Sequence, residues 1–397
     1  MKTEKFLHFS VLIGLIAGLS FCSEKKDNSK STMLVGAAAL GASRSSAGTG
    51  TGEVSTFAGP SQGTTYGGDT DGTGNAASFQ SPNGITSDGT DLYVADQLNN
   101  KIRKISIATG AVSTFAGPAQ GTSTSGDTDG TGNTARFANP AGITSDGTNL
   151  YVTDSGTNKI RKIVIATAAV STMAGPAQGT STSGDTDGTG NAARFSFPFG
   201  IIFDGTNLYV TDKGNNKIRK IAIANGAVST LAGPVQGTST SGDTDGTGSA
   251  ARFNNPNGIT SDGTNLYVTD SVTNKVRKIV IATAAVSTFA GPVQGTSTSG
   301  DTDGTGNAAR FSNPNGITSD GTNLYIADYQ NNKVRKIVIA TAAVNTFAGP
   351  AQGTTTFGDT DGALTTARFG GPTGILKTGT NLYVTDSSTN KIRKISL

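Results

Sequence analysis

The feature that most constrains this chain is a motif that returns every 58 residues. Its clearest copy covers residues 149–163 and reads Asn-Leu-Tyr-Val-Thr-Asp, then four residues, then Lys-Ile-Arg-Lys-Ile. A constant period of this size is typical of repeat architectures, in which each unit buries its apolar faces against its neighbours. The aspartate of the motif recurs six times, at Asp96, Asp154, Asp212, Asp270, Asp328 and Asp386.

Each repeat contains four short apolar runs separated by turn signals. In the second repeat these runs cover residues 141–144, 150–153, 160–165 and 169–173. They are rich in Val, Ile, Tyr and Thr, which favour strands, and Gly, Asp and Asn separate them, which favour tight turns. Four antiparallel strands repeated six times predict an all-β fold, a six-bladed β-propeller of four-stranded blades. A seven-bladed ring or an open solenoid is the alternative.

The two ends of the repeat region predict how the ring closes. Residues 54–57 read as a fourth strand with no repeat before it, and the last repeat stops after its third strand. We therefore expect the N-terminal strand to complete the last blade, which would remove open sheet edges. The propeller is predicted to cover residues 53–397.

The first 52 residues read as an export signal and a tether. Residues 1–22 hold two lysines and then a nine-residue apolar run, which is too short to span a membrane and is typical of a signal peptide. Leu19-Ser20-Phe21-Cys22 resembles the end of a bacterial lipoprotein signal, with Cys22 as the lipidated residue, although a small residue is usual at the position of Phe21. Residues 23–52 read as a flexible tether. We expect an exported protein, lipid-anchored in the cell envelope at the outer membrane or surface, or otherwise secreted.

Charge and composition argue against two classes of function. The net charge of +3 arises before Glu53, and residues 53–397 carry 25 charges of each sign, which argues against a nucleic-acid partner. The single histidine is His8, the single cysteine is Cys22, and no glutamate follows Glu53. Zinc-dependent and histidine-based mechanisms therefore lack ligands and bases in the propeller. We expect a monomer that touches a membrane only through its lipid anchor.

Several motifs resemble NHL repeats. They are Pro-Asn-Gly-Ile-Thr, Asn-Leu-Tyr-Val-Thr-Asp, Asn-Lys-Ile-Arg-Lys-Ile and Val-Ser-Thr-Phe-Ala-Gly. The whole of residues 53–397 is similar to bacterial NHL-repeat propellers with an inserted Asp-Gly-Thr-Gly…Ala-Arg-Phe loop. The resemblance implies a six-bladed propeller. The family includes lyases, lactonase-like relatives and scaffolds that bind protein or RNA, so the fold does not fix the function.

Long loops rich in Gly, Ser and Thr join consecutive blades, as at residues 117–140. We expect these loops and the turns after the second strands to share one side of the ring, which we name the long-loop face and expect to be the binding face. The Asp-Thr-Asp-Gly-Thr-Gly segment of the first five long loops partly follows a calcium-loop pattern but lacks the glutamate at position twelve, and Ala363 and Leu364 break the pattern in the last loop. A turn in which the aspartates cap backbone N–H groups is the alternative. Calcium is the single cofactor considered, and its candidate ligands are Asp69, Asp71, Asp127, Asp129, Asp185, Asp187, Asp243, Asp245, Asp301 and Asp303.

The strand-end aspartates stand in every blade, which indicates a structural role. We expect each to cap its turn or to pair with an arginine of the third strand. Departures from the near-identical repeats are better functional leads, and Phe199, Lys213 and Tyr329 break the symmetry near the predicted channel mouth. We predict that these three side chains contact a ligand.

The combined reading is a non-enzymatic binding scaffold that contacts a protein or a glycan through the long-loop face, with no catalytic residue assigned. One alternative is an enzyme at the central channel, either a metal-assisted lyase or a lactonase-type hydrolase. The other alternative is a structural envelope protein stabilised by calcium.

Overall fold

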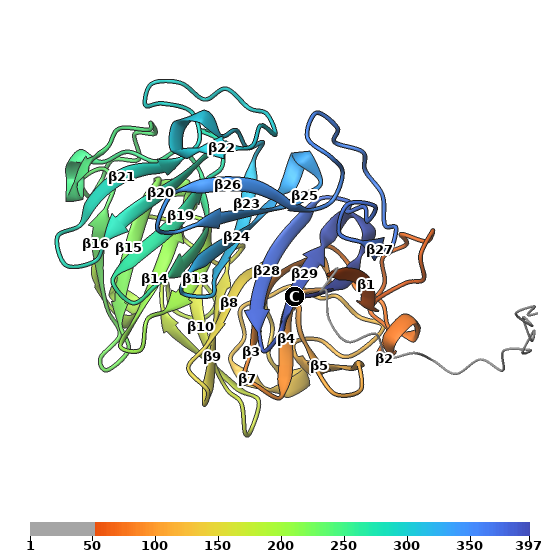
Figure 1. Ribbon diagram of the computed structural model, residues 1–397. Helices are drawn as coiled ribbons and strands as arrows, with labels where there is room; N and C mark the ends of the chain where they lie inside the picture. Colours follow the sequence, from red (N-terminus) through yellow and green to blue (C-terminus); the bar gives the residue numbers. More distant parts are fainter. Residues whose placement is uncertain (1–51) are drawn as a thin grey trace, which may run out of the picture. The chain divides into compact units, whose positions relative to one another are not determined.

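The structure is a computed structural model, and it describes residues 52–397. These residues form six sheets that surround a central axis, as a six-bladed β-propeller (Figure 1). The all-β prediction and the number of blades are confirmed. The predicted signal peptide, the lipidation site Cys22 and the tether as far as Thr51 lie outside the described residues. Within the described range, no helix is long and apolar enough to cross a membrane.

Four strands of each blade begin where the motifs predict. The first strands, which lie next to the axis, are β3 (Pro82–Ser87), β8 (Pro140–Ser145), β13 (Pro198–Phe203), β18 (Pro256–Ser261), β23 (Pro314–Ser319) and β28 (Pro372–Thr378). The second strands are β4 (Asp91–Asp96), β9 (Asn149–Asp154), β14 (Asn207–Asp212), β19 (Asn265–Asp270), β24 (Asn323–Asp328) and β29 (Asn381–Asp386). The third strands are β5 (Lys101–Ser106), β10 (Lys159–Val164), β15 (Lys217–Ala222), β20 (Lys275–Val280), β25 (Lys333–Val338) and β30 (Lys391–Ser396). The fourth strands are β6 (Ala111–Ala116), β11 (Ala169–Ala174), β16 (Ala227–Ala232), β21 (Ala285–Ala290), β26 (Ala343–Ala348) and β1 (Glu53–Ala58).

Each blade holds five strands, so the prediction of four-stranded blades is wrong in this detail. The long loop folds back and adds a two-residue strand to the outer edge of the fourth strand, as in the pairing of Gly72 with Val112. Two residues carry no apolar alternation, so the strand pattern could not show them. The outermost strands are β2 (Gly72–Thr73), β7 (Gly130–Thr131), β12 (Gly188–Thr189), β17 (Gly246–Thr247), β22 (Gly304–Thr305) and β27 (Gly362–Ala363).

Short 3₁₀ helices stand at two places in the repeat. After the outermost strand they are η1 (Gly74–Ala76), η3 (Gly132–Thr134), η4 (Gly190–Ala192), η6 (Gly248–Ala250) and η7 (Gly306–Ala308). After the second strand they are η2 (Gln97–Asn99), η5 (Lys213–Asn215), η8 (Tyr329–Asn331) and η9 (Ser387–Thr389).

The ring closes as the sequence predicts. The last sheet has the strand order β27-β1-β30-β29-β28, so the N-terminal strand β1 lies beside the C-terminal strand β30. Val54 of β1 pairs with Ile395 of β30. Figure 1 shows the red and blue ends of the described chain meeting in this sheet. The first described strand therefore completes the last blade.

Both faces of every blade are packed. One cluster joins Tyr93 and Ile102 of the first blade to Phe137 and Val152 of the second, all fully buried. Five equivalent clusters fill the other blade junctions. Because both faces of a blade are packed, apolar residues of one strand can lie on either face of the sheet. The phenylalanine at the end of each long loop, such as Phe137, is buried in one of these clusters and anchors the loop at the junction.

The first strands meet at the axis through glycine. A Cβ atom on Gly142 would lie 2.2 Å from the carbonyl oxygen of Phe199 in the next blade, and one on Gly374 would lie 2.2 Å from that of Asn83. No side chain fits at such a separation. Glycine therefore sets how closely the blades approach and how narrow the central channel becomes.

Candidate functional site

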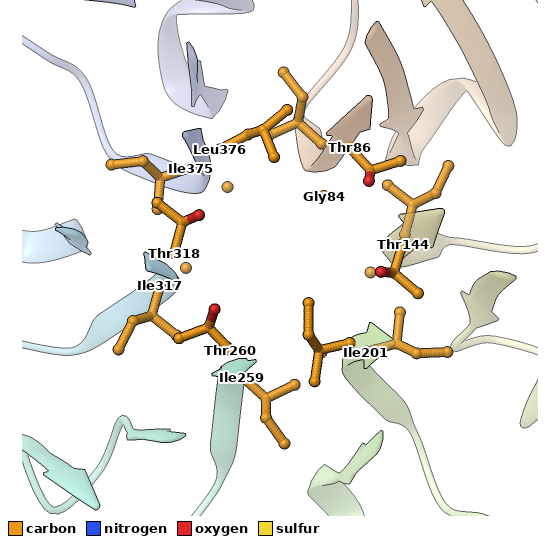
Figure 2. Close-up of a pocket in the computed structure, with 18 of the residues that line it drawn as sticks. Gly84, Thr86, Thr144, Ile201, Ile259, Thr260, Ile317, Thr318, Ile375 and Leu376 are labelled. Atoms are coloured by element: carbon orange, nitrogen blue, oxygen red, sulfur yellow. The ribbon is translucent and has the colours of Figure 1, made fainter. Parts of the chain in front are cut away.

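The central channel is lined by the first strands of all six blades, as Figure 2 shows. The cavity measures about 100 Å³, and in the described residues its lining contains no titratable side chain. At one level the ring presents four threonine hydroxyl groups and two apolar side chains, which are Thr86, Thr144, Ile202, Thr260, Thr318 and Leu376. The channel wall therefore offers no group for acid–base catalysis.

The strand-end aspartates are structural, as predicted. Asp96 accepts hydrogen bonds from Arg103 at 2.8 Å, from the backbone N–H of Gln80 at 2.7 Å and from Asn99 at 2.9 Å. Neither Asp96 nor Arg103 is exposed, and the guanidinium lies 5.2 Å from the ring centroid of Phe79. Burial raises the pKa of Asp96 to about 6, although Arg103 opposes that shift. The same pair recurs in every blade.

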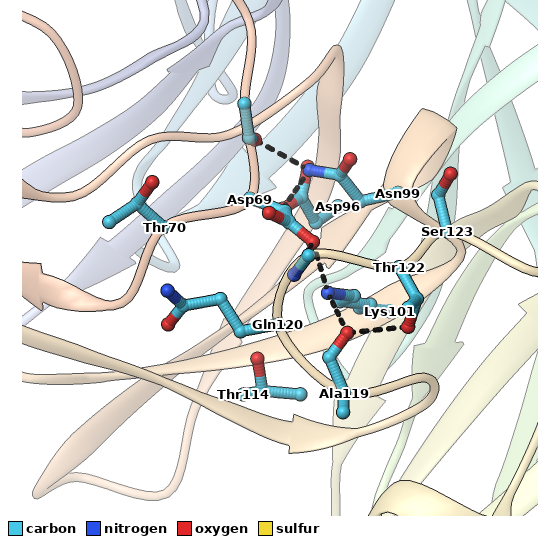
Figure 3. Close-up of polar contacts among 12 residues, drawn as sticks. Asp69, Thr70, Asp96, Asn99, Lys101, Thr114, Ala119, Gln120, Thr122 and Ser123 are labelled. Atoms are coloured by element: carbon cyan, nitrogen blue, oxygen red, sulfur yellow. Dashed lines mark hydrogen bonds and ion pairs between the residues drawn. The ribbon is translucent and has the colours of Figure 1, made fainter.

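The candidate calcium ligands are each held by a cation of the protein itself. Asp71 accepts from Arg103 at 2.7 Å, so this arginine bridges a strand-end aspartate and a loop aspartate. Asp69 accepts from Lys101 at 2.6 Å and from the backbone N–H of Gly121 in the next long loop at 2.7 Å. Figure 3 shows Lys101 between Asp69 and the carbonyl oxygen of Ala119. The ammonium group thus contacts the kind of oxygen atoms that a calcium ion would need.

The remaining loop aspartates repeat this arrangement. Asp127, Asp185, Asp243 and Asp301 pair with the lysine that opens the third strand, and Asp129, Asp187, Asp245 and Asp303 pair with its arginine. Asp359 and Asp361 do the same in the last loop, which sequence reasoning left out because Ala363 and Leu364 break the pattern there. In residues 52–397 no group of three or more His, Cys, Asp or Glu side chains could hold a metal ion. The calcium assignment stays a prediction, and these ion pairs weigh against it.

Two of the three predicted contact residues come together in the third blade. Lys213, at the start of η5, has its Nζ atom 4.5 Å from the ring centroid of Phe199 and 5.9 Å from that of Phe197. The two rings are stacked, with centroids 6.3 Å apart. Phe199 is largely buried at the channel mouth, whereas Phe197 is 41% exposed. We name Phe197, Phe199 and Lys213 the blade-3 cluster.

Phe197 was not among the predicted contact residues. Its backbone has a φ of 52°, and the matching positions hold Asn139, Asn255 and Asn313, also at positive φ. Asparagine tolerates this left-handed region, whereas a bulky aromatic residue rarely adopts it. An aromatic residue in place of a repeated asparagine before the Pro-X-Gly motif is the signal that could have found it.

Tyr329 lies in a different place. It opens η8, and a Cβ atom on Gly371 of the sixth blade would lie 2.8 Å from its ring. Beside it, Phe357 packs over Gly370 in the same way and is 56% exposed. Tyr329 therefore belongs to a second aromatic group, at the junction of the fifth and sixth blades, and not to the blade-3 cluster.

Large apolar side chains are exposed at several points in the loops and turns of the long-loop face. They are Tyr66, Leu98, Phe197, Val235, Val272, Val293 and Phe357. All seven stand where other repeats hold small or polar residues. Leu98 and Val272 replace a turn glycine, Phe197 an asparagine, Phe357 a serine, Tyr66 a threonine, and Val235 and Val293 an alanine.

Comparisons with known proteins agree with this architecture. The chain is 29% identical over 301 residues to NHL repeat-containing protein 2 of Bos taurus, a match that covers 68% of this chain and 40% of that protein. The chain thus spans less than half the length of the curated relatives it matches. No protein-family model matches it.

Solved structures share the fold at low identity. A Bacteroides thetaiotaomicron structural genomics protein of unknown function aligns with a TM-score of 0.63 and 22% identity, covering 87% of this chain and 76% of that one. An auxiliary nutrient binding protein from the same species aligns with a TM-score of 0.62 and 17% identity, with the same coverage. Fold and site together define a six-bladed β-propeller in which the described channel lining holds no titratable side chain. The curated relatives and the shared fold support the NHL-repeat propeller that the motifs predict.

Proposed function

We propose that this propeller is a non-enzymatic binding scaffold that contacts a protein or a glycan through its long-loop face. It is exported, and it is lipid-anchored in the cell envelope through Cys22 or otherwise secreted. The observation that carries the proposal is the exposure of large apolar side chains in the loops of that face, at positions where other repeats hold small or polar residues. Exposed aromatic side chains such as Phe197 and Phe357 supply a large contact area when a partner binds.

Two further observations support a binding role. The long-loop aspartates that could act as acids or metal ligands are engaged by lysine and arginine, and the described channel lining holds no titratable group. A Bacteroides propeller of the same fold is described as an auxiliary nutrient binding protein, and the export signal expected here suits a similar task.

A variant with its face restored to the repeat sequence tests the proposal. It carries Leu98→Gly, Phe197→Asn, Val272→Gly and Phe357→Ser, each the residue that another repeat holds at that position. Wild-type protein is first screened on arrays of glycans and of extracellular proteins, and the hits are then measured with the variant. We expect the hits to be lost. If the ligands bind wild-type protein and the variant equally well, the long-loop face is not the binding face. If the protein converts one of the ligands to a product, the enzyme alternative is favoured.

A further inference from the structure

Lys213 is a cation without an anion. Within residues 52–397 it makes no ion pair and no side-chain hydrogen bond, whereas the buried lysines and arginines of the third strands are all paired with aspartates. Its ammonium group contacts the faces of Phe197 and Phe199 instead, and burial lowers the pKa of Lys213. A partly desolvated cation that contacts only aromatic rings would be stabilised further by a negatively charged partner.

Phe197 combines a strained backbone with an exposed side chain. A non-glycine residue with a φ of 52° costs about 1 kcal/mol or more, and the cost is greater for a bulky aromatic than for asparagine. The ring repays little of this cost by packing, because it is 41% exposed. Backbone strain of this kind gathers at ligand-binding positions. The geometry therefore points to a contact outside the propeller.

The surroundings of the blade-3 cluster define what could bind. Phe197 and Phe199 stack at an interplanar angle of 23° and form a platform beside the channel mouth. At the position of Phe199 the next two blades hold Asn257 and Asn315. Asn315 makes no side-chain hydrogen bond within the described chain and lines the channel, and the buried Oδ1 of Asn257 has no partner there. Asn257 is buried and does not line the channel, so the mouth combines an aromatic platform, an unpaired cation and the amide of Asn315.

We propose that this mouth binds a uronic-acid residue of an acidic polysaccharide. The apolar face of the sugar ring stacks on Phe197, its carboxylate pairs with Lys213, and one of its hydroxyl groups bonds with the amide of Asn315. An acidic peptide would satisfy Lys213 but offers no flat apolar ring for the platform. The inference rests on the proposed binding function and names the ligand class.

Calorimetric titration of the full chain tests this assignment. The probes are oligosaccharides of galacturonate, glucuronate and mannuronate, a neutral galactose oligosaccharide, and poly-glutamate. We expect at least one uronate to bind, the neutral sugar to bind at least tenfold more weakly, and added salt to weaken uronate binding. Phe197→Asn and Lys213→Ser should each weaken uronate binding at least tenfold. Both substitutions install the residue of another repeat at that position, so the variants retain the fold, which a thermal melt verifies.

Lys220→Ser is the matched control, because it removes the same charge from the third strand of the same blade, away from the mouth. It should leave uronate binding unchanged. The proposal is overturned if no uronate binds, if the neutral sugar binds equally well, if Lys213→Ser has no effect, or if poly-glutamate binds in place of the sugars. If uronate binding fails but the face-restored variant loses its binding to another ligand, the proposed binding scaffold is still supported. If that variant also retains every ligand, both proposals fail.

Discussion

The hydroxyl group of Thr385 donates a hydrogen bond of 2.6 Å to the backbone carbonyl oxygen of Asn83, across the junction between the last blade and the first. The same hydroxyl accepts the backbone N–H of Gly374 at 2.6 Å. It therefore joins two blades where the ring closes. Thr153, Thr211 and Thr269 make the equivalent bond to the next blade, and the first and fifth blades hold Ala95 and Ala327 at this position.

Thr385→Val should lower the free energy of unfolding by about 1–3 kcal/mol, because it leaves a buried carbonyl and a buried N–H without partners while keeping the side-chain shape. Ala95→Thr adds the missing hydroxyl between the first and second blades and should raise the free energy of unfolding by about 1 kcal/mol. Equilibrium denaturation of the two variants beside wild type measures both. Equal midpoints for wild type and Thr385→Val would show that this bond does not contribute to closure.

Phe197→Asn should stabilise the propeller by about 1 kcal/mol, since asparagine accepts the positive φ that phenylalanine resists. Asn139→Phe in the second blade makes the reverse change at the same repeat position and should destabilise by a similar amount. Denaturant midpoints check both substitutions. A destabilised Phe197→Asn protein would mean that the ring contributes more by packing than the backbone loses by strain.

The repeat period made the fold predictable. The turn residues and four apolar runs recur at the same spacing in each repeat. This spacing predicted the number of blades, the strand order and the closure of the last blade by β1. The outermost strand escaped prediction because Gly72 and Thr73 form it through backbone pairing alone. Local patterns report side chains that alternate between faces, and two residues of an edge carry no such alternation.

The site was predictable in part. Phe199 and Lys213 were found because they depart from identical repeats, and the structure brings them together. Tyr329 was grouped with them on the same reasoning but lies at another blade junction, because a departure from a repeat carries no information on distance. The pairing of Asp69 with Lys101 was also hidden, since the two residues stand 32 positions apart and meet only when the long loop folds back.

Calcium should leave the melting temperature unchanged, because the loop carboxylates already pair with lysine and arginine. A ligand of the native state would raise the midpoint by mass action. Melts in millimolar calcium, in magnesium and in chelator make the comparison. Lys159→Met should destabilise the protein by about 2 kcal/mol or more, since it leaves Asp127 without its cation. A rise in the melting temperature of the wild-type protein with calcium but not with magnesium would support the predicted calcium sites.

The buried aspartates should make the propeller more stable on the acid side of neutral. Burial raises the pKa of Asp154 to about 6, against 3.8 for an ordinary aspartate, and the strand-end aspartates of the other blades shift in the same direction. A group that holds its proton more tightly when folded takes up protons on folding between these two values. Its contribution to stability is therefore complete below pH 3.8 and is lost as the pH rises through about 6.

The half-buried turn aspartates act in the opposite direction and lower the stability at acid pH. Partial burial raises the pKa of Asp146, but hydrogen bonds from the side chain and backbone of Asn149, from the backbone of Thr148 and from Tyr151 outweigh it and lower that pKa. Its contribution to stability is therefore present above pH 3.8 and is lost as the pH falls further. The free energy of unfolding should therefore reach its maximum near pH 3.8 and fall as the pH rises from there to about 6. Denaturation at a series of pH values measures the curve. Asp154→Asn removes one buried titrating group and should flatten the fall on the neutral side, and an unchanged slope there would place the protonation elsewhere.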